Sequence, residues 1–362
     1  MTERRFRVGV LGATGMVGQR FVSLLADHPW FEVSAVAASA RSAGQTYEAA
    51  VGDRWALSTP MPARVAKLTV GDASHVDAIA PGVDFVFCAV DMTKEETRAL
   101  EDAYARHEAP VISNNSAHRA TPDVPVLVPE VNPEHAAVIP AQRKRLGTRR
   151  GFVTAKPNCS IQSYVPVLHP LLDLGLNRIV VATYQAISGA GKTFATWPEM
   201  VDNVVPFIKG EEEKSELEPL KLWGRVTSEG IVPAAGPVIS AHCIRVPVSD
   251  GHLAAVSMGL TRSAPKEEIL ARWREFEGRP QKLGLPSAPR PVLTYFEDDA
   301  RPQTRLDRDL GKGMGIGVGR LRADPIFDYR FVALSHNTVR GAAGGAILTA
   351  ELLVADGYIE PR

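Results

Sequence analysis

"GVLGATGMVGQR", residues 9–20, joins an apolar, strand-like run to a helical pattern through a turn that carries Gly12, Gly15 and Gly18. Glycines in such a turn let backbone N–H groups approach a diphosphate and place that anion at the positive end of a helix. The alternative is a tight turn without a ligand. Because the motif follows the first strand and opens the first helix, it favours a dinucleotide site formed by Gly12, Ala13, Thr14, Gly15, Met16 and Val17.

Strand-like and helical patterns alternate in the first part of the chain, which is typical of a parallel sheet with crossover helices. After about residue 157, longer strand-like runs such as "RIVVATYQAIS" (178–188) indicate a mixed or antiparallel sheet. The Ala- and Gly-rich stretch at 337–357 predicts a long helix that returns to the first domain. We therefore expect an α/β fold, with a Rossmann-like nucleotide-binding domain over 1–157 plus 337–362 and an α+β catalytic and dimerisation domain of mixed sheet over 158–336.

Composition excludes several classes of protein. The 362 residues are 45% hydrophobic, which is enough for two cores, and 41 basic residues balance 41 acidic ones. No net field therefore holds a nucleic acid or a membrane, and no apolar run reaches membrane-spanning length. Two of the three cysteines, Cys88 and Cys243, lie in apolar strand-like runs, which argues against a disulfide framework. We expect a cytoplasmic protein.

The end of the second predicted strand indicates which dinucleotide binds. An NAD site usually carries Asp or Glu there for the ribose hydroxyls, but this chain has "AASARSAGQ" at 37–45. Ser39, Arg41 and Ser42 offer hydroxyls and a guanidinium to a 2′-phosphate instead. The alternative for Arg41 is an exposed loop arginine. We expect the cofactor to be NADP.

Cys159 stands in "AKPNCSIQS" (155–163), directly after a short apolar strand and at the start of a helical pattern. A thiol in the first turn of a helix has a lowered pKa, because the helix dipole and free N–H groups favour the thiolate. The competing interpretation is an inert core thiol. The nearby nucleotide motif favours a nucleophile.

A thiolate beside a nicotinamide suggests one reaction: the sulfur adds to an aldehyde, hydride leaves to the cofactor, and a thioester passes to an acceptor. Such chemistry needs a proton shuttle and no metal ion. His252 follows a Ser-Asp-Gly turn that would place it at a strand edge facing a cleft. Spacing alone does not select it among the nine histidines.

Seven segments together resemble aspartate-β-semialdehyde dehydrogenase of the archaeal and fungal type. They are "GATGMVGQRF", "SNNSAHR", "KPNCSIQ", "QAISGAGK", "ELEPLKLWG", "HCIRVPVSDGH" and "NTVRGAAGGAILTAELL", in the order of that family from about residue 5 onward. The resemblance implies NADPH-dependent reduction of L-aspartyl-4-phosphate to L-aspartate-4-semialdehyde and phosphate, a step toward lysine, threonine, methionine and isoleucine. It also suggests a homodimer or homotetramer.

The resemblance implies a role for each matching residue. Cys159 matches the nucleophile, His252 the acid/base catalyst and Gln185 the residue that orients the acyl intermediate. Arg245 would grip the α-carboxylate and Glu218 the α-amino group. Phosphate would bind Lys221 and Arg119, with Asn115 or Asn158, and the loops around the nicotinamide would present Ser188, Gly189, Lys192 and Asn337. From spacing alone, Glu218 and Lys221 would be a solvated ion pair.

Pro219 departs from a simple helix at this point, because proline removes a backbone donor and clashes with the preceding turn. A kink or a new first turn is therefore expected beside Glu218.

Two other functions compete with the dehydrogenase that the resemblance implies. One is a related acyl reductase acting on N-acetylglutamyl phosphate or malonyl-CoA, neither of which has the free amine that Glu218 would bind. The other is a nucleotide-binding regulatory protein without catalysis.

Overall fold

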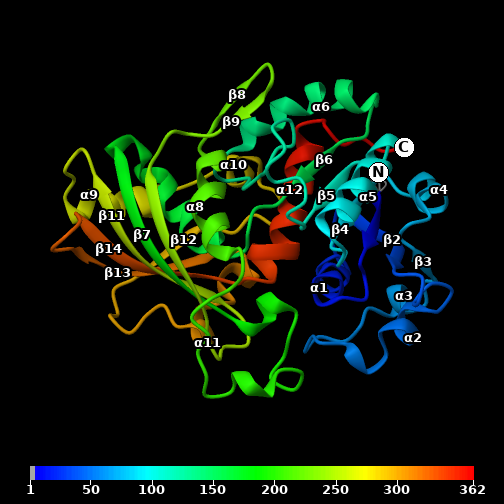
Figure 1. The fold of residues 1–362 in the computed structure, drawn as a ribbon, viewed down its shortest axis with the longest axis horizontal. Helices are drawn as coiled ribbons and strands as arrows, with labels where there is room; N and C mark the ends of the chain where they lie inside the picture. The colour runs from blue at the N-terminus through cyan, green and yellow to red at the C-terminus, as the bar shows by residue number, and fades with distance from the viewer. Residues whose placement is uncertain (1–4) are drawn as a thin grey trace.

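The computed structural model describes residues 5–362, which build two six-stranded sheets (Figure 1). The first sheet is parallel throughout, in the order β3-β2-β1-β4-β5-β6. Its strands are β1 (Phe6–Leu11), β2 (Phe31–Ala38), β3 (Val70–Asp72), β4 (Phe85–Cys88), β5 (Val111–Ser113) and β6 (Val153–Ala155). The chain reverses its direction of winding between β3 and β4, and ligands bind at the carboxyl ends of strands at such a switch point. The predicted Rossmann-like sheet is confirmed.

Six helices belong to this part of the chain: α1 (Met16–Leu24), α2 (Tyr47–Val51), α3 (Ala63–Ala66), α4 (Val76–Ile79), α5 (Lys94–Arg106) and α6 (Ile139–Leu146). The glycine turn before α1 is fixed by sterics. Gly12 has φ +78°, and a Cβ there would lie 2.3 Å from the carbonyl oxygen of Ala89. Any other residue would force the turn away from β4, so the backbone of this turn stays open to a ligand. No helix within residues 5–362 has the length and apolar character needed to cross a bilayer.

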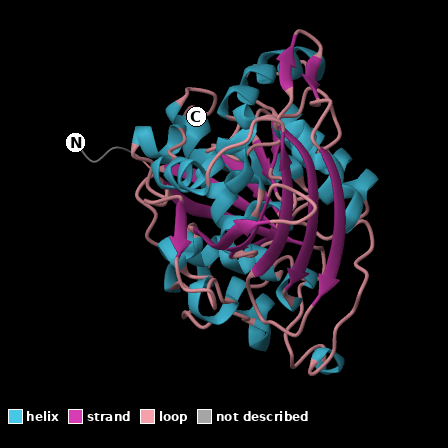
Figure 2. Ribbon diagram, turned by 90° about the vertical axis from the view of Figure 1, so that its left-hand side faces the viewer, coloured by secondary structure: helices cyan, strands magenta, loops and turns pink. Residues whose placement is uncertain are grey.

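The second sheet is mixed, in the order β10-β7-β11-β14-β13-β12. The pairs β7–β10 and β12–β13 are parallel and the other three pairs are antiparallel. Figure 2 shows its long strands side by side. The strands of this half, including the hairpin β8–β9, are β7 (Leu176–Gln185), β8 (Arg225–Thr227), β9 (Gly230–Val232), β10 (Val238–Arg245), β11 (His252–Leu260), β12 (Leu293–Phe296), β13 (Ile316–Ala323) and β14 (Tyr329–Ser335). Its helices are α7 (Val165–Leu168), α8 (Glu211–Leu222), α9 (Lys266–Glu275), α10 (Arg279–Leu283) and α11 (Thr304–Asp307).

The C-terminal helix α12 (Gly344–Ala355) lies between the two sheets in Figure 1. Its Ala346, Ile347 and Leu353 share a buried cluster with Val8 and Val10 of β1. The expected continuous helix over 337–357 is wrong in its first turns. Residues Val339–Ala343 form a π-helical turn, and Ala342 leaves helical geometry at φ −141° and ψ −105°.

The helix expected after Asn158 is also broken. A 3₁₀ turn (Ser160–Ser163) comes first, Tyr164 leaves helical geometry, and α7 and a second 3₁₀ segment (His169–Leu174) follow. Pro166 and Pro170 explain the breaks, because neither has an N–H to donate to the carbonyl four residues earlier. Cys159 thus precedes a single short turn rather than a long helix.

Candidate active site

The nucleophile and the histidine predicted from the sequence lie next to each other. Cys159 follows β6 and is partly accessible to solvent, whereas His252 is the first residue of β11 and is fully buried. The Sγ of Cys159 lies 3.4 Å from Nε2 of His252. On the other side of the ring, the N–H of Ala186 donates to Nδ1 at 3.0 Å. The neutral imidazole therefore carries its proton on Nε2, facing the sulfur.

The expected lowering of the thiol pKa is wrong. Burial and then the charge of Glu211 raise the pKa of Cys159, and they outweigh the cations that lower it, which are Lys156, Arg119 and Arg245. The short 3₁₀ turn contributes little, since a helix dipole grows with the number of aligned peptide units. The thiolate therefore depends on the side chains around it.

His252 is neutral at physiological pH. Burial and then the charge of Arg245 lower its pKa to about 3. The hydrogen bond from Ala186 acts in the same direction, because a protonated Nδ1 would face another donor. The ring is thereby held as a neutral donor toward the sulfur.

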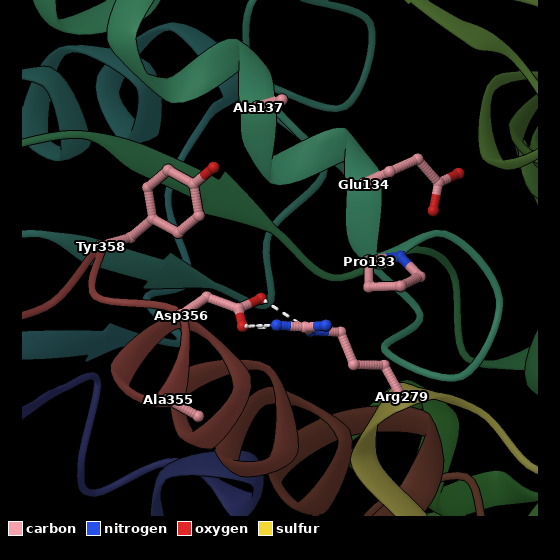
Figure 3. Close-up of a pocket in the computed structure, with 7 residues that line it drawn as sticks. All are labelled: Pro133, Glu134, Ala137, Arg279, Ala355, Asp356 and Tyr358. Atoms are coloured by element: carbon pink, nitrogen blue, oxygen red, sulfur yellow. Dashed lines mark hydrogen bonds and ion pairs between the residues drawn. The ribbon is translucent and has the colours of Figure 1, made fainter. Parts of the chain in front are cut away.

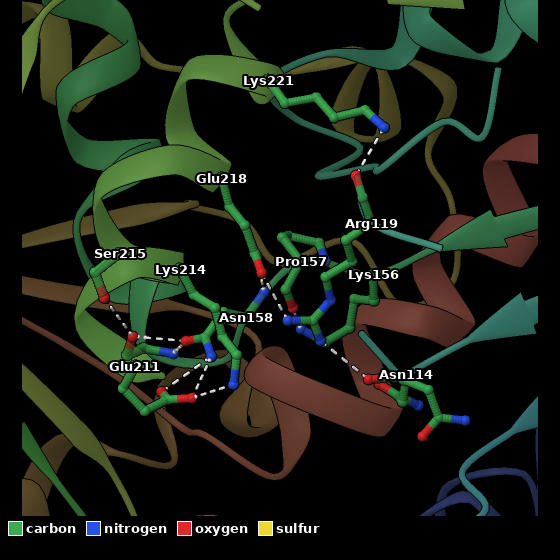
Figure 4. A network of polar contacts seen from close by, with 12 residues as sticks. Asn114, Arg119, Lys156, Pro157, Asn158, Glu211, Lys214, Ser215, Glu218 and Lys221 are labelled. Carbon is green, nitrogen blue, oxygen red and sulfur yellow. Dashed lines mark hydrogen bonds and ion pairs between the residues drawn. The ribbon is translucent and has the colours of Figure 1, made fainter. Parts of the chain in front are cut away.

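A buried carboxylate, Glu211, organises the polar groups around this pair (Figure 4). Asn158 Nδ2 donates to both of its oxygens at 3.0 Å, and Gln185 Nε2 donates at 3.2 Å. Lys214 Nζ donates at 2.8 Å. Burial raises the pKa of Glu211, but Lys214 and the amide donors outweigh it and lower that pKa overall. The carboxylate is therefore charged at neutral pH.

Sequence analysis missed Glu211 and Lys214. They have the same Glu-x-x-Lys spacing as Glu218 and Lys221, seven residues earlier on α8. The spacing alone was the available signal, and it does not distinguish the two pairs. Their contacts distinguish them: Glu211 accepts a hydrogen bond from Gln185, whereas no such bond to Glu218 or Lys221 is found within residues 5–362.

Glu218 and Lys221 have other partners. Glu218 accepts from Arg119 Nη1 at 2.9 Å and from the N–H of Asn158 at 2.6 Å. Lys221 Nζ donates to three carbonyl oxygens, those of Arg119, Thr121 and Val124, at 2.8, 2.7 and 3.0 Å. An ammonium has three protons, so none remains for a phosphate. This geometry does not support the phosphate role expected of Lys221.

Pro219 does not interrupt α8. Its missing N–H would have bonded to the carbonyl of Ser215, and the hydroxyl of Tyr164 donates to that oxygen instead, at 2.9 Å. A side chain from a neighbouring segment thus satisfies the acceptor that proline leaves free. The expected new first turn is absent, because α8 continues through Pro219 to Leu222.

Two predicted substrate residues remain: Arg245 lies near Cys159 and His252, whereas Asn115 contacts residues of the parallel-sheet domain. Arg245, on β10, is buried and donates from Nη1 to the carbonyl of Ala186 at 2.6 Å. A Cβ at Gly189 would lie 3.0 Å from that Nη1, so the loop covers Arg245 closely. Asn115 instead donates to Glu101 and Cys88 in the core of the parallel sheet. Its orientation does not support a phosphate contact.

The glycine turn lines a hollow of about 220 Å³ with the end of β2. Gly12, Thr14, Gly15, Ser39 and Arg41 contribute to its wall, whereas Ala13, Met16, Val17 and Ser42 do not. The guanidinium of Arg41 is exposed and forms no ion pair within residues 5–362.

The loops expected around a nicotinamide are tied together. Asn337 donates to the hydroxyl of Ser188 and accepts the N–H of Gly251, both at 2.8 Å. Gly251 immediately precedes His252, so the Asn337 amide holds the loop that leads into β11. Lys192, in contrast, is exposed.

A larger hollow, of about 630 Å³, lies elsewhere (Figure 3). Its lining residues are Pro133, Glu134, Ala137, Arg279, Ala355, Asp356 and Tyr358. Arg279 and Asp356 form an ion pair with each other, and no cysteine or histidine faces the space. The described residues also hold no cluster of three potential metal-binding side chains.

Comparison with known proteins points to one family. A family model described as semialdehyde dehydrogenase, NAD binding domain, matches residues 7–139, and one described as semialdehyde dehydrogenase, dimerisation domain, matches residues 168–340. The chain is 44% identical to an aspartate-semialdehyde dehydrogenase of Archaeoglobus fulgidus over 98% of its length and 100% of the relative's. It is 43% identical to that of Aspergillus fumigatus, with 98% of each chain covered.

Solved structures agree with this similarity. The structure of aspartate semialdehyde dehydrogenase with NADP from Candida albicans has a TM-score of 0.88 at 37% identity, covering 98% of this chain and all of that one. An aspartate semialdehyde dehydrogenase II from Vibrio cholerae, solved with ASA, has a TM-score of 0.74 at 25% identity, with 98% and 99% covered.

Proposed function

The chain belongs to the aspartate-semialdehyde dehydrogenase family, and we propose that it reduces L-aspartyl-4-phosphate to L-aspartate-4-semialdehyde and phosphate with NADPH. This is a step toward lysine, threonine, methionine and isoleucine. The observation that carries the proposal is the 3.4 Å distance between Cys159 Sγ and His252 Nε2. Around this pair, Arg245 could bind the α-carboxylate of an amino-acid substrate, and Glu211 could bind its α-amino group.

The side chains divide the reaction between them. The Cys159 sulfur reacts as the thiolate: it attacks the acyl carbon, the bond from that carbon to the phosphate oxygen breaks, and a thioester and free phosphate form. Arg119 and Lys214 line the same pocket, and the buried Nε of Arg119 has no partner within residues 5–362, so we assign these two cations to the departing phosphate. NADPH, when bound, supplies the hydride that reduces the thioester carbon. His252 holds a proton on Nε2 where the oxyanion develops, and the thiolate then leaves as the aldehyde forms.

The structure favours Glu211 over Glu218 as the group that receives the α-amino group. The charge of Glu211 acts on the pKa values of Cys159, Arg245 and His252, which places it centrally among them. Glu218 is instead paired with Arg119. A buried carboxylate at this point also argues against N-acetylglutamyl phosphate and malonyl-CoA, which have no free amine to pair with it.

Substituting Glu211 tests this assignment. Glu211→Gln should raise the KM for aspartate semialdehyde by about 10–100-fold, because one hydrogen bond to a charged group is worth about 1.5–3 kcal/mol. Glu218→Gln should mainly raise the KM for phosphate, because the ion pair with Glu218 that holds Arg119 in position is lost. Steady-state kinetics with each substrate varied separates the two. Glu213→Gln, on the exposed side of the same helix, is the matched control. An unchanged amino-substrate KM in Glu211→Gln would reject the role.

The groups that line the hollow beside the glycine turn suit the 2′-phosphate end of NADP. Gly12 leaves the turn backbone uncovered, and Ser39 and Arg41 stand where a 2′-phosphate would lie. Arg41→Asp should weaken NADPH binding by about 10–100-fold and NADH binding far less, because only NADPH has the phosphate that pairs with the guanidinium. Fluorescence titration with both dinucleotides measures this. Lys67→Asp, an exposed cation of the same half, should affect neither. Equal losses for both dinucleotides in Arg41→Asp would remove the 2′-phosphate argument.

A spectrophotometric assay tests the proposed function itself. Purified protein with aspartate semialdehyde, phosphate and NADP should produce NADPH, and the rate should vanish when phosphate is omitted. N-acetylglutamate semialdehyde in place of aspartate semialdehyde should give little turnover. A faster rate with the acetylated substrate would favour the alternative acyl reductase.

We further propose that the chain assembles as a homodimer or homotetramer through the outer face of the mixed sheet. Along β7 the buried residues alternate with exposed ones, and Val180 and Tyr184 are 38% and 36% exposed. The neighbouring Leu253 and Ala255 of β11 continue that apolar face.

The domains would divide near residues 157 and 337, as expected from the sequence. The three unpaired cysteines suit a reducing compartment such as the cytoplasm.

A further inference from the structure

Lys156 is a buried cation beside the nucleophile that the reaction described above does not use. Its side chain is 2% exposed, and within residues 5–362 its Nζ donates only to the carbonyl of Pro157, at 2.8 Å. Two other buried cations have more acceptors or a charged one: Lys221 has three carbonyls, and Arg340 has the carboxylate of Glu130. Buried charges are normally paired, so a lysine left with one weak partner suggests a second, intermittent one.

Packing places Lys156 and Cys159 against the same glycine-rich turn. A Cβ at Gly341 would lie 2.9 Å from Cys159 Cβ, and a Cβ at Gly345 would lie 3.4 Å from Lys156 Cδ. The two charges influence each other. The ammonium lowers the pKa of the thiol. Burial and then Arg119 and Arg340 lower the pKa of Lys156 to about 7, against the raising effects of the thiolate and, after it, of Glu218.

The charged groups that act on Cys159 are Glu211, Lys156, Arg119 and Arg245, and the titratable ring of His252 faces its sulfur. Glu211 opposes a thiolate, and the N–H of Ala186 keeps His252 neutral. Once substrate binds, its phosphate and carboxylate neutralise the two arginines, an argument that rests on the proposed function. Only Lys156 then remains as a cation for the sulfur.

We propose that the Lys156 ammonium is the counter-ion of the Cys159 thiolate, both before attack and when the sulfur leaves the product. Lys156 is thus an electrostatic partner of the nucleophile rather than a group that touches substrate.

The buried charge of Lys156 lowers the free energy of unfolding. Its pKa in the folded protein lies below the ordinary 10.5, so the unfolded chain binds more protons between the two values. The destabilisation is therefore complete below about pH 7 and fades as the pH rises toward 10.5.

Alkylation of Cys159 tests the proposal without any substrate. Iodoacetamide is reacted with the whole protein across a pH series, and mass spectrometry of the Cys159 peptide gives the rate. In Lys156→Met the midpoint should rise by about one pH unit, with a roughly tenfold slower rate at neutral pH. Lys221→Met removes a buried lysine absent from the surroundings of the sulfur and should leave the midpoint in place. A folded Lys156→Met with an unshifted midpoint would overturn the proposal.

Two further measurements cover the case in which Lys156→Met is unstable or does not fold. The melting temperature of Lys156→Met below pH 7 should be no lower than that of the wild type, because an apolar side chain replaces a poorly paired charge. If the variant does not fold, lysine ε-¹³C NMR on the wild type decides: carbamidomethylation of Cys159 should lower the pKa of Lys156, and an unmoved titration would contradict the pairing. Neither readout needs turnover. A protein without dehydrogenase activity can therefore still show the pairing, and an active one can lack it.

Discussion

Cys159→Ala should lower kcat for phosphate-dependent oxidation of aspartate semialdehyde by on the order of 10⁴-fold or more, with NADPH binding unchanged. The loss is large because the sulfur forms the covalent intermediate, so its removal deletes the reaction path rather than one contact. Cys159 is not among the residues that line the hollow beside the glycine turn, which is why the cofactor should still bind. Steady-state rates and fluorescence titration with NADPH measure the two effects.

Cys243→Ala is the matched control for that experiment. Cys243 is also free and lies on β10, but it is fully buried and its sulfur faces the hydroxyl of Ser215 rather than a histidine. Turnover should survive this change. Near-normal turnover in Cys159→Ala would refute the nucleophile assignment.

His252→Asn should lower kcat by roughly 10²–10⁴-fold, the usual contribution of a positioned acid or base. Asparagine keeps a polar group near the sulfur, but it cannot transfer a proton from the position that Nε2 occupies 3.4 Å from Sγ. The KM for aspartate semialdehyde should change little, because the assigned substrate contacts come from Arg245 and Glu211. Steady-state kinetics at saturating NADP separates kcat from KM.

His169→Asn controls for the loss of a partly buried imidazole. His169 packs beside Phe276 and is not among the groups that act on the pKa of Cys159. It should keep the wild-type kcat. A His252→Asn variant that matched it would show that the ring is structural.

The sequence allowed the fold to be predicted because the decisive signals are local. Alternating patterns predicted the parallel sheet, and the glycine turn at Gly12 depends on a backbone geometry that other residues rarely adopt. The breaks in the helices have a different origin. Pro166 was visible in the sequence, but the intact α8 depends on Tyr164 reaching the Ser215 carbonyl from another segment. No pattern along α8 contains that contact.

The candidate site could be predicted only in part. Cys159 was identified from its motif, whereas His252 needed the family resemblance, since spacing does not select one histidine from nine. Glu211 was missed because its spacing to Lys214 repeats in Glu218 and Lys221. The thiol pKa was predicted with the wrong sign because burial and a carboxylate distant in sequence decide it. Such effects are set by tertiary packing.

The most direct test of the account is a single turnover without phosphate. Protein, NADP and aspartate semialdehyde are mixed rapidly, NADPH is followed by absorbance, and the quenched protein is digested and analysed by mass spectrometry. We expect a burst of NADPH stoichiometric with protein and an aspartyl thioester on the Cys159 peptide; added phosphate should discharge the thioester and start continuous formation of NADPH. A burst with no acyl group on Cys159, or with the group on another residue, would contradict it.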